Sequence, residues 1–212
     1  MPISTTTTAA ISLFKEATDV NAYKWTYPHM EPYRIQESII DNLFRTKPTS
    51  ANIDEDIIFL KVSTLNLYYG TYIQATKQLA KGIYGLKIDS RLVGGDISLI
   101  EDIATKCTLR RNYSFATKYC ACHQPDKFPI YDRKVGECLA HIIAKGNLSG
   151  ISGTYTNVHN MMKKDYAFYR GIYDAFIQQY GLTSLSYREV DWYLWTANKC
   201  LTSRPLLLFS LV

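Results

Sequence analysis

Apolar residues recur along most of the chain at the three- and four-residue spacing of an amphipathic α-helix. The range 31–44 shows this clearly, with Ile35, Ile39, Ile40 and Leu43 on one side. The strict alternation of apolar and polar residues that is typical of a half-buried strand is scarce. The pattern therefore predicts an all-α protein.

The same spacing, with glycines and prolines as boundaries, predicts the other helices. They are expected over about 57–68, 73–83, 97–104, 114–122, 132–144, 160–180 and 186–199. The stretch 146–157 is rich in Gly, Ser and Thr, so we expect any boundary between lobes there. The expected architecture is a single unit over residues 1–212, a compact array of about seven or eight helices in two closely packed lobes with a groove between them.

Composition agrees with a globular protein, since 47% of the 212 residues are hydrophobic and 20% are charged. The net charge of +5 permits a nucleic-acid partner without requiring one. The five cysteines are odd in number and irregularly spaced, which favours a reducing, cytoplasmic location. No apolar run approaches the roughly 20 residues that cross a bilayer, so no membrane partner is expected. The apolar tail, 206–212, is expected to pack on the protein body or on a partner.

Several catalytic signatures are absent, including the Gly-rich phosphate loop with Lys-Ser/Thr, His-Glu-x-x-His and Gly-x-Ser-x-Gly. The remaining candidate is Asp132, in the run from Pro129 to Val135 at the start of an expected helix. Two interpretations are open at this point. Asp132 is either a catalytic carboxylate held in a fixed direction or the N-cap of its helix.

Basic residues are dense around this segment. Phosphate binding is favoured where fixed cations meet the positive end of a helix dipole. The candidate cations are Arg110, Arg111, Lys118, Arg133 and Lys134. The alternative is that these residues form an ordinary solvated surface.

The segment Pro129-Ile130-Tyr131-Asp132-Arg133-Lys134-Val135 resembles the Pro-Val-Asp-x-x-Val segment of the helix-hairpin-helix DNA glycosylase superfamily, including its 8-oxoguanine glycosylase branch. The resemblance covers about residues 50–200. It implies a fold of two helical lobes, double-stranded DNA as the partner and Asp132 as the catalytic aspartate. It also implies that Asn66, in a turn between two early helices, enters the DNA at the flipped base.

The chain departs from the family in the hairpin that precedes the aspartate. Glycines are missing from the range 112–116, and Ser114 stands where the strand-cleaving enzymes carry a lysine. A serine hydroxyl cannot form an imine with a sugar aldehyde. The sequence therefore predicts a monofunctional enzyme of base excision repair that hydrolyses the base-sugar bond with water.

Two other groups of residues have competing interpretations. Cys120, Cys122 and His123 lie within four residues, but two Cys one residue apart face different sides of a helix, so we expect no metal and no other cofactor. The aromatic residues Trp192 and Trp195 either stack on bases or belong to the core.

Three functions remain open from the sequence. The first is an N-glycosylase that flips a damaged base into a pocket between lobes. The second is a non-catalytic nucleic-acid-binding module of the same fold, and the third is a helical protein-interaction module. The lesion, the choice between DNA and RNA and the oligomeric state are not determined by these patterns.

Overall fold

The computed structural model describes residues 19–202, and all its regular elements are helical. The all-α prediction is confirmed. The helices are α2 (Asp19–Met30), the short 3-10 helix η1 (Glu31–Tyr33), α3 (Arg34–Arg45), α4 (Glu55–Tyr68), α5 (Thr76–Leu86), α6 (Asp89–Gly94), α7 (Ser98–Lys106), α8 (Tyr113–His123), α9 (Arg133–Ala144), α10 (Tyr155–Lys164), α11 (Tyr166–Gln179) and α12 (Tyr187–Thr202). The tail contact expected for 206–212 lies outside the described residues.

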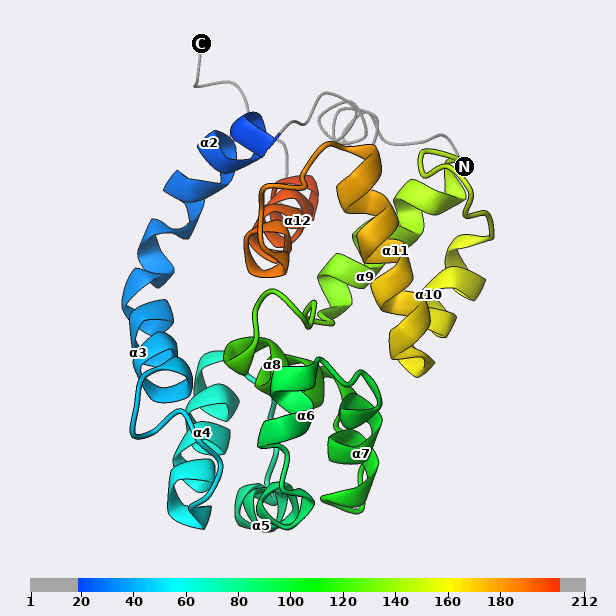
Figure 1. Cartoon of the computed structure of the whole chain (residues 1–212). Coiled ribbons are helices and arrows are strands. Elements are labelled where there is room, and N and C mark those ends of the chain that lie inside the picture. The colour runs from blue at the N-terminus through cyan, green and yellow to red at the C-terminus, as the bar shows by residue number, and fades with distance from the viewer. Residues whose placement is uncertain (1–18, 203–212) are drawn as a thin grey trace.

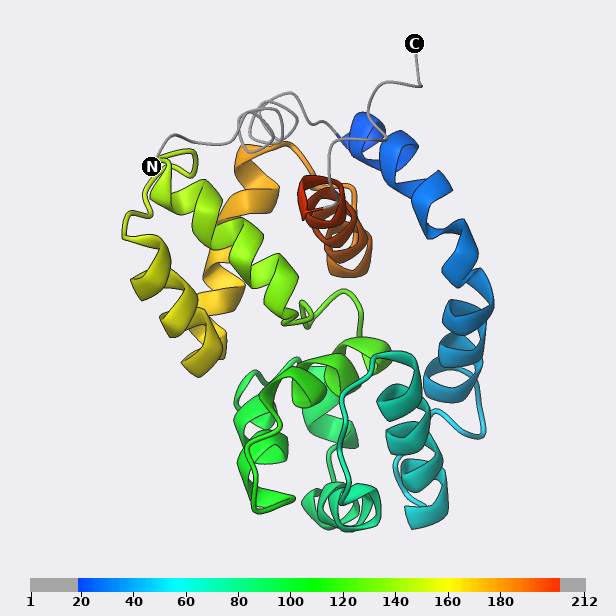
Figure 2. The ribbon, with the colours of Figure 1, turned by 180° about the vertical axis from the view of Figure 1, so that it is seen from behind.

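The helices form two lobes (Figure 1). One lobe holds α4 to α8, and the other holds α9 to α12. Helices α2 and α3 run along one side and join the lobes, because α2 packs on α12 while α3 packs on α4 and α8. The view from behind shows that the α8–α9 connection links the lobes near the middle of the molecule (Figure 2). The stretch 146–154 connects α9 to α10, which pack against each other.

The structure extends the expected array of helices in three places. Helix α2 and the short α6 were not expected, and the helix expected over 160–180 is divided into α10 and α11. The division falls at Asp165, whose backbone is extended and whose side chain accepts a hydrogen bond from Phe168 N at 3.0 Å. An N-cap of this kind satisfies a free amide at the start of a helix, so α11 begins independently of α10.

The interior of the α4–α8 lobe contains a buried lysine. Lys61 is fully buried, and its amine donates hydrogen bonds to Ser50 O at 3.0 Å, Ala51 O at 3.2 Å and Asn52 Oδ1 at 3.1 Å. Tyr119 also donates to Asn52 Oδ1, at 2.6 Å. Burial of the amine is tolerated because each of its protons has an acceptor. The loop before α4 is thereby attached to α4 and α8.

Close packing shapes this lobe as well. A Cβ atom on Gly82 would lie 2.6 Å from the backbone of Cys107, closer than side-chain carbons approach. Glycine therefore lets α5 contact the chain just after α7. Among the described residues, no helix is both long enough and apolar enough to cross a lipid bilayer.

Candidate functional site

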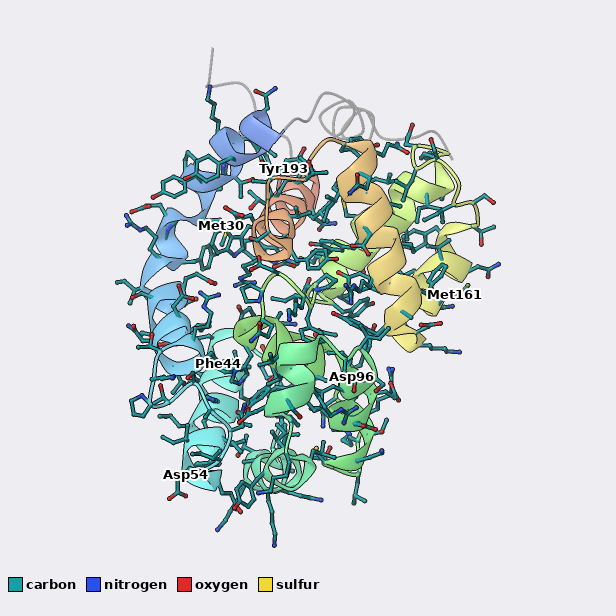
Figure 3. The ribbon with its side chains drawn as sticks, viewed as in Figure 1. Met30, Phe44, Asp54, Asp96, Met161 and Tyr193 are labelled. Atoms are coloured by element: carbon teal, nitrogen blue, oxygen red, sulfur yellow. The ribbon has the colours of Figure 1, made fainter. Side chains whose placement is uncertain are left out.

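A cavity of about 180 Å³ opens where α3, α4, α8, α12 and the α8–α9 connection meet. Met30, at the end of α2, contributes to its wall and lies beside α12 in Figure 3. An engineered protein cavity of about 150 Å³ is known to hold a benzene ring. The cavity between the lobes therefore has room for a planar heterocycle. Its polar lining is formed by Gln36, Glu37, Lys118, Asp132, Arg188 and Asp191.

Lys118 supplies an amine to this cavity from the middle of α8. Its side chain is only 5% exposed, and Nζ donates a hydrogen bond to Ser114 Oγ at 2.6 Å. Nζ also lies 3.9 Å from Asp132 Oδ2 and 5.6 Å from the centre of the Tyr69 ring. Burial lowers the pKa of Lys118, and the charge of Asp132 offsets part of this effect. The neutral, nucleophilic form of the amine is thus favoured relative to a lysine in water.

Asp132 has two contacts, one for each carboxylate oxygen. Oδ1 accepts a hydrogen bond from Lys134 N at 2.8 Å and caps α9, while Oδ2 faces Lys118. The cap interpretation and the site interpretation are therefore compatible in this geometry. The backbone just before Asp132 is fixed by α8, since Ser114 Oγ donates to Tyr131 O and Tyr131 N donates to Thr117 Oγ1, both at 3.0 Å. These bonds hold the carboxylate beside the amine.

Arg188 also lines the cavity and joins distant parts of the chain. Its side chain on α12 is 13% exposed and donates to Glu37 on α3, to the hydroxyl of Tyr69 after α4, and to Asp191 Oδ2 at 3.0 Å. Burial raises the pKa of Asp191 to about 7, although the charge of Arg188 acts in the other direction. The cavity thus contains three carboxylates and two basic groups at short range.

Aromatic rings complete the cavity. Trp192 and Trp195 line it from α12, and Tyr33 packs edge-on against Trp195 with ring centres 5.5 Å apart. Tyr193, by contrast, is buried in the core against Trp25, beside α2 in Figure 3. The aromatic cluster near the C-terminus is therefore divided between the cavity and the core. An aromatic lining with a few polar groups is typical of sites for planar ligands.

Asn66 has a different place from the one implied by the resemblance. Its side chain accepts hydrogen bonds from Thr71 Oγ1 and Ile73 N, both at 2.8 Å, and donates to Ile73 O at 3.0 Å. All of these partners lie in the turn between α4 and α5. Asn66 therefore anchors this turn, in which Tyr72, Gln74 and Ala75 are exposed.

The other basic residues predicted to bind phosphate differ in their exposure and in their ion pairs. Arg110 is exposed, whereas Arg111 pairs with Glu101 at 2.7 Å and donates to two carbonyl groups at the end of α10. Arg133 is 75% exposed and lies 3.7 Å from Glu137, and Lys134 lies over the ring of Trp195 at 5.8 Å. Arg110, Arg133 and Lys134 are thus more available to phosphate than Arg111 or the buried Lys118.

The cysteine and histidine cluster is internal. Cys120, Cys122 and His123 are all buried, and the four cysteines with described side chains are free thiols. Burial raises the pKa of Cys122 to about 12, so its thiol stays protonated. In the range 19–202, no group of three or more His, Cys, Asp or Glu side chains is arranged to hold a metal ion.

Sequence reasoning did not identify Glu37, Arg188 or Asp191. Arg188 pairs with Glu37, which lies 151 residues away, and an ion pair between such distant residues leaves no local signal in the sequence. Lys118 was treated as a surface cation. The only sequence signal for its burial is the surrounding run of small and aromatic residues on α8.

A protein of Haemophilus influenzae, described as uncharacterized, is 34% identical over 140 residues. The aligned part covers 63% of this chain and 62% of that protein, so the chain spans less than two thirds of this relative's length. No solved structure matches.

A family model also matches the sequence. It is described as HI_0787_N, an N-terminal domain, and it matches residues 17–127, which include Lys118 and end five residues before Asp132. Neither this description nor that of the relative states an activity. Because the match covers more than half of the 212 residues, the chain belongs to the HI_0787_N family.

Proposed function

We propose that the protein is an N-glycosylase that acts on a flipped base in double-stranded DNA, as the resemblance to the helix-hairpin-helix glycosylases implies. The observation that carries this proposal is the buried amine of Lys118, 3.9 Å from Asp132 Oδ2 in a cavity with aromatic walls. An amine with a lowered pKa next to a carboxylate is a recurring arrangement for covalent catalysis. Base excision repair is the process that such an activity serves.

The proposal differs from the sequence expectation in the identity of the nucleophile. Ser114 was expected to stand in place of a catalytic lysine, which left water to attack the sugar. Lys118 lies one helical turn after Ser114 and is hydrogen-bonded to it. We therefore assign the attack on the sugar to the amine of Lys118. If water hydrolysed the base-sugar bond instead, the enzyme would be monofunctional, as the sequence predicts.

The chemical steps balance without any added reactant. The neutral amine donates its electron pair to C1′ of the sugar, the C1′–N bond breaks, and its electrons leave with the base. One of the two N–H protons of the secondary ammonium formed at Lys118 passes through Asp132 to the departing base. The C1′–O4′ bond then opens, the remaining N–H proton passes to O4′, and a neutral C1′=N Schiff base to Lys118 remains. The carboxylate of Asp132 also stabilises the positive charge that develops on the sugar.

Two features support nucleic acid as the substrate. The cavity has room for one heterocycle between Trp192, Trp195 and the tyrosines, and base stacking on aromatic rings is tolerant of sequence. Arg110, Arg133 and Lys134 can bind phosphates on the outside, close to the α8–α9 connection.

The test is borohydride trapping of the full chain on duplexes that carry oxidised or alkylated bases, and on a duplex with an aldehydic abasic site. We expect a covalent adduct with the wild type and none with Lys118→Gln. Lys134→Gln is the matched control, because it removes a neighbouring amine and should still be trapped. Base release without trapping would show a monofunctional enzyme that uses water.

A second candidate is a non-catalytic nucleic-acid-binding or protein-interaction module of the same fold. It is favoured by the cap hydrogen bond of Asp132, which explains that residue without catalysis. Salt-sensitive DNA binding without base release or trapping would support a binding module. Absence of DNA binding at low salt would leave the protein-interaction module.

A further inference from the structure

Ser114, in the first turn of α8, makes two hydrogen bonds through one oxygen atom. Its hydroxyl donates to Tyr131 O at 3.0 Å and accepts from Lys118 Nζ at 2.6 Å. A serine hydroxyl has a single proton and a carbonyl oxygen can only accept, so this proton is committed to Tyr131. Ser114 can therefore bind the amine of Lys118 only as an acceptor, whether the amine is neutral or charged.

These bonds also restrict the amine. A neutral lysine amine has two N–H protons and one lone pair. Ser114 Oγ accepts one proton, and the carboxylate of Asp132, with Oδ2 3.9 Å from Nζ, attracts the other. Both acceptors lie on the side of the amine formed by the start of α8 and the α8–α9 connection. The lone pair, from which a nucleophile attacks, is then directed away from both of them.

The charged groups around this amine come from several elements. Asp132 faces it from the α8–α9 connection. Asp191 and Arg188 face it from α12, Cys122 lies on α8 itself, and the ring of Tyr69 lies 5.6 Å away. Burial lowers the pKa of the lysine amine, Arg188 lowers it further, and the two carboxylates act in the other direction. One hydrogen-bond acceptor more or less is enough to shift such a balance.

We propose that Ser114 is a positioning residue, which holds the amine of Lys118 so that its lone pair is directed into the cavity for attack on the sugar. This role rests on the proposed function, because it requires Lys118 to be the nucleophile. It gives Ser114 a part in the reaction although its own hydroxyl cannot form an imine. A misplaced reacting group lowers the rate of an enzyme by about 10²-fold, so the hydrogen bond has a measurable effect.

Thr117 provides a matched control, because its hydroxyl binds the same connection but not the amine. It accepts from Tyr131 N and donates to Ser114 O, both at 3.0 Å. Ser114→Ala and Thr117→Val each remove one hydroxyl and its two hydrogen bonds, and both loosen the segment before Asp132. Only Ser114→Ala removes an acceptor from Lys118. A role confined to structure would therefore give the two variants the same properties.

The first measurement follows the amine itself. In the full chain with isotope-labelled lysine, the NMR signal of the Lys118 side chain is recorded against pH and assigned with Lys118→Gln. An acceptor stabilises the charged amine more than the neutral one, so Ser114→Ala should titrate at a lower pH than the wild type, by roughly 0.5–1 pH unit. Ser114→Thr keeps the hydroxyl and should titrate like the wild type, and so should Thr117→Val.

The second measurement is the single-turnover rate of borohydride trapping on a duplex with an aldehydic abasic site. At saturating duplex, Ser114→Ala should be trapped about 10²-fold more slowly than the wild type. The pH dependence of its rate should move to lower pH, while its affinity for the duplex, measured by anisotropy, should not change. Ser114→Thr should recover the rate, and Thr117→Val should keep the pH dependence of the wild type.

Equal titration of Lys118 in Ser114→Ala and the wild type would overturn the role of Ser114. A Thr117→Val variant that reproduces every change of Ser114→Ala would overturn it as well. Trapping distinguishes these failures from failure of the proposed function. Lys118-dependent trapping at the wild-type rate in Ser114→Ala would overturn only the positioning role. A titration that Ser114→Ala shifts, in a protein that is never trapped, would overturn the attack on the sugar and retain only the contact between Ser114 and the amine.

Discussion

The amine of Lys61 and the side-chain oxygen of Asn52 lie 3.1 Å apart in the interior of the α4–α8 lobe. The same oxygen accepts a hydrogen bond from Tyr119, and the backbone and side-chain amides of Asn52 donate to Asp89. Lys61 and Asn52 thus connect the loop before α4 to α6 and α8. The lobe that carries Lys118 depends on this buried polar network.

Lys61→Met should strongly destabilise the protein. The substitution keeps much of the side-chain volume but leaves Ser50 O, Ala51 O and Asn52 Oδ1 short of a donor. Loss of one partner from a buried charged network lowers the free energy of unfolding by about 3 kcal/mol. Urea denaturation measures this change. Lys77→Met, at an exposed position on α5, should change it by less than about 0.5 kcal/mol, and equal midpoints for the two variants would contradict the prediction.

Asp132→Asn should retain the fold and lose the activity. Asparagine is as good an N-cap as aspartate, so the melting temperature should stay close to that of the wild type. The charge next to Lys118 is removed, and the rate of borohydride trapping should fall by at least about 10²-fold. Circular dichroism and single-turnover trapping test both parts. An unchanged trapping rate in a folded variant would remove Asp132 from the mechanism.

Asp191 should make stability depend on pH. Burial raises its pKa to about 7 in the folded protein, while an unfolded aspartate titrates near about 4. Between these values the unfolded state binds fewer protons, so the free energy of unfolding falls as the pH rises from about 4 to about 7. Asp191→Asn lacks this titration. From about pH 4 to about pH 7 the wild type should therefore lose stability relative to Asp191→Asn. Urea denaturation of both proteins at several pH values measures this loss, and a difference in unfolding free energy that stays constant with pH would disprove the assignment.

Binding to duplex DNA should depend on salt through the exposed cations. Arg110→Gln and Arg133→Gln should each reduce the slope of log affinity against log salt by about 0.9, the value for one phosphate contact. Lys118→Gln should leave the slope unchanged, since its amine is buried. Anisotropy titrations at several salt concentrations measure these slopes. Equal slopes for all the variants would show that DNA does not contact this face.

Local patterns were sufficient for the helical class and for the position of Asp132. The spacing of Ile35, Ile39 and Leu43 shows one helix directly, and the prolines before Asp132 mark the start of another. Some boundaries were missed for an equally local reason. The N-cap at Asp165 ends one helix and starts the next although the apolar stripe continues past it, and the spacing of apolar residues alone does not reveal such a cap.

Tertiary relationships could not be predicted in this way. Whether Lys118 is buried depends on Tyr69 and Asp132, which come from other elements, and periodicity along α8 is weak because its whole surface is covered. Trp192 and Tyr193 are adjacent in sequence, yet one lines the cavity and the other enters the core. The side of α12 that meets the cavity is fixed by Arg188 and its partners, Glu37 on α3 and Tyr69 just after α4.

The ion pair between Arg188 and Glu37 limits how early the cavity can form during protein synthesis. Protein chains emerge from the ribosome N-terminus first, at about 5–20 residues per second, and their early parts can fold before the later parts exist. Glu37 emerges 151 residues before Arg188. The wall between α3 and α12 therefore cannot close until nearly all of the described chain has been translated, and nascent chains that stall between Lys118 and Arg188 carry Lys118 without an enclosed cavity.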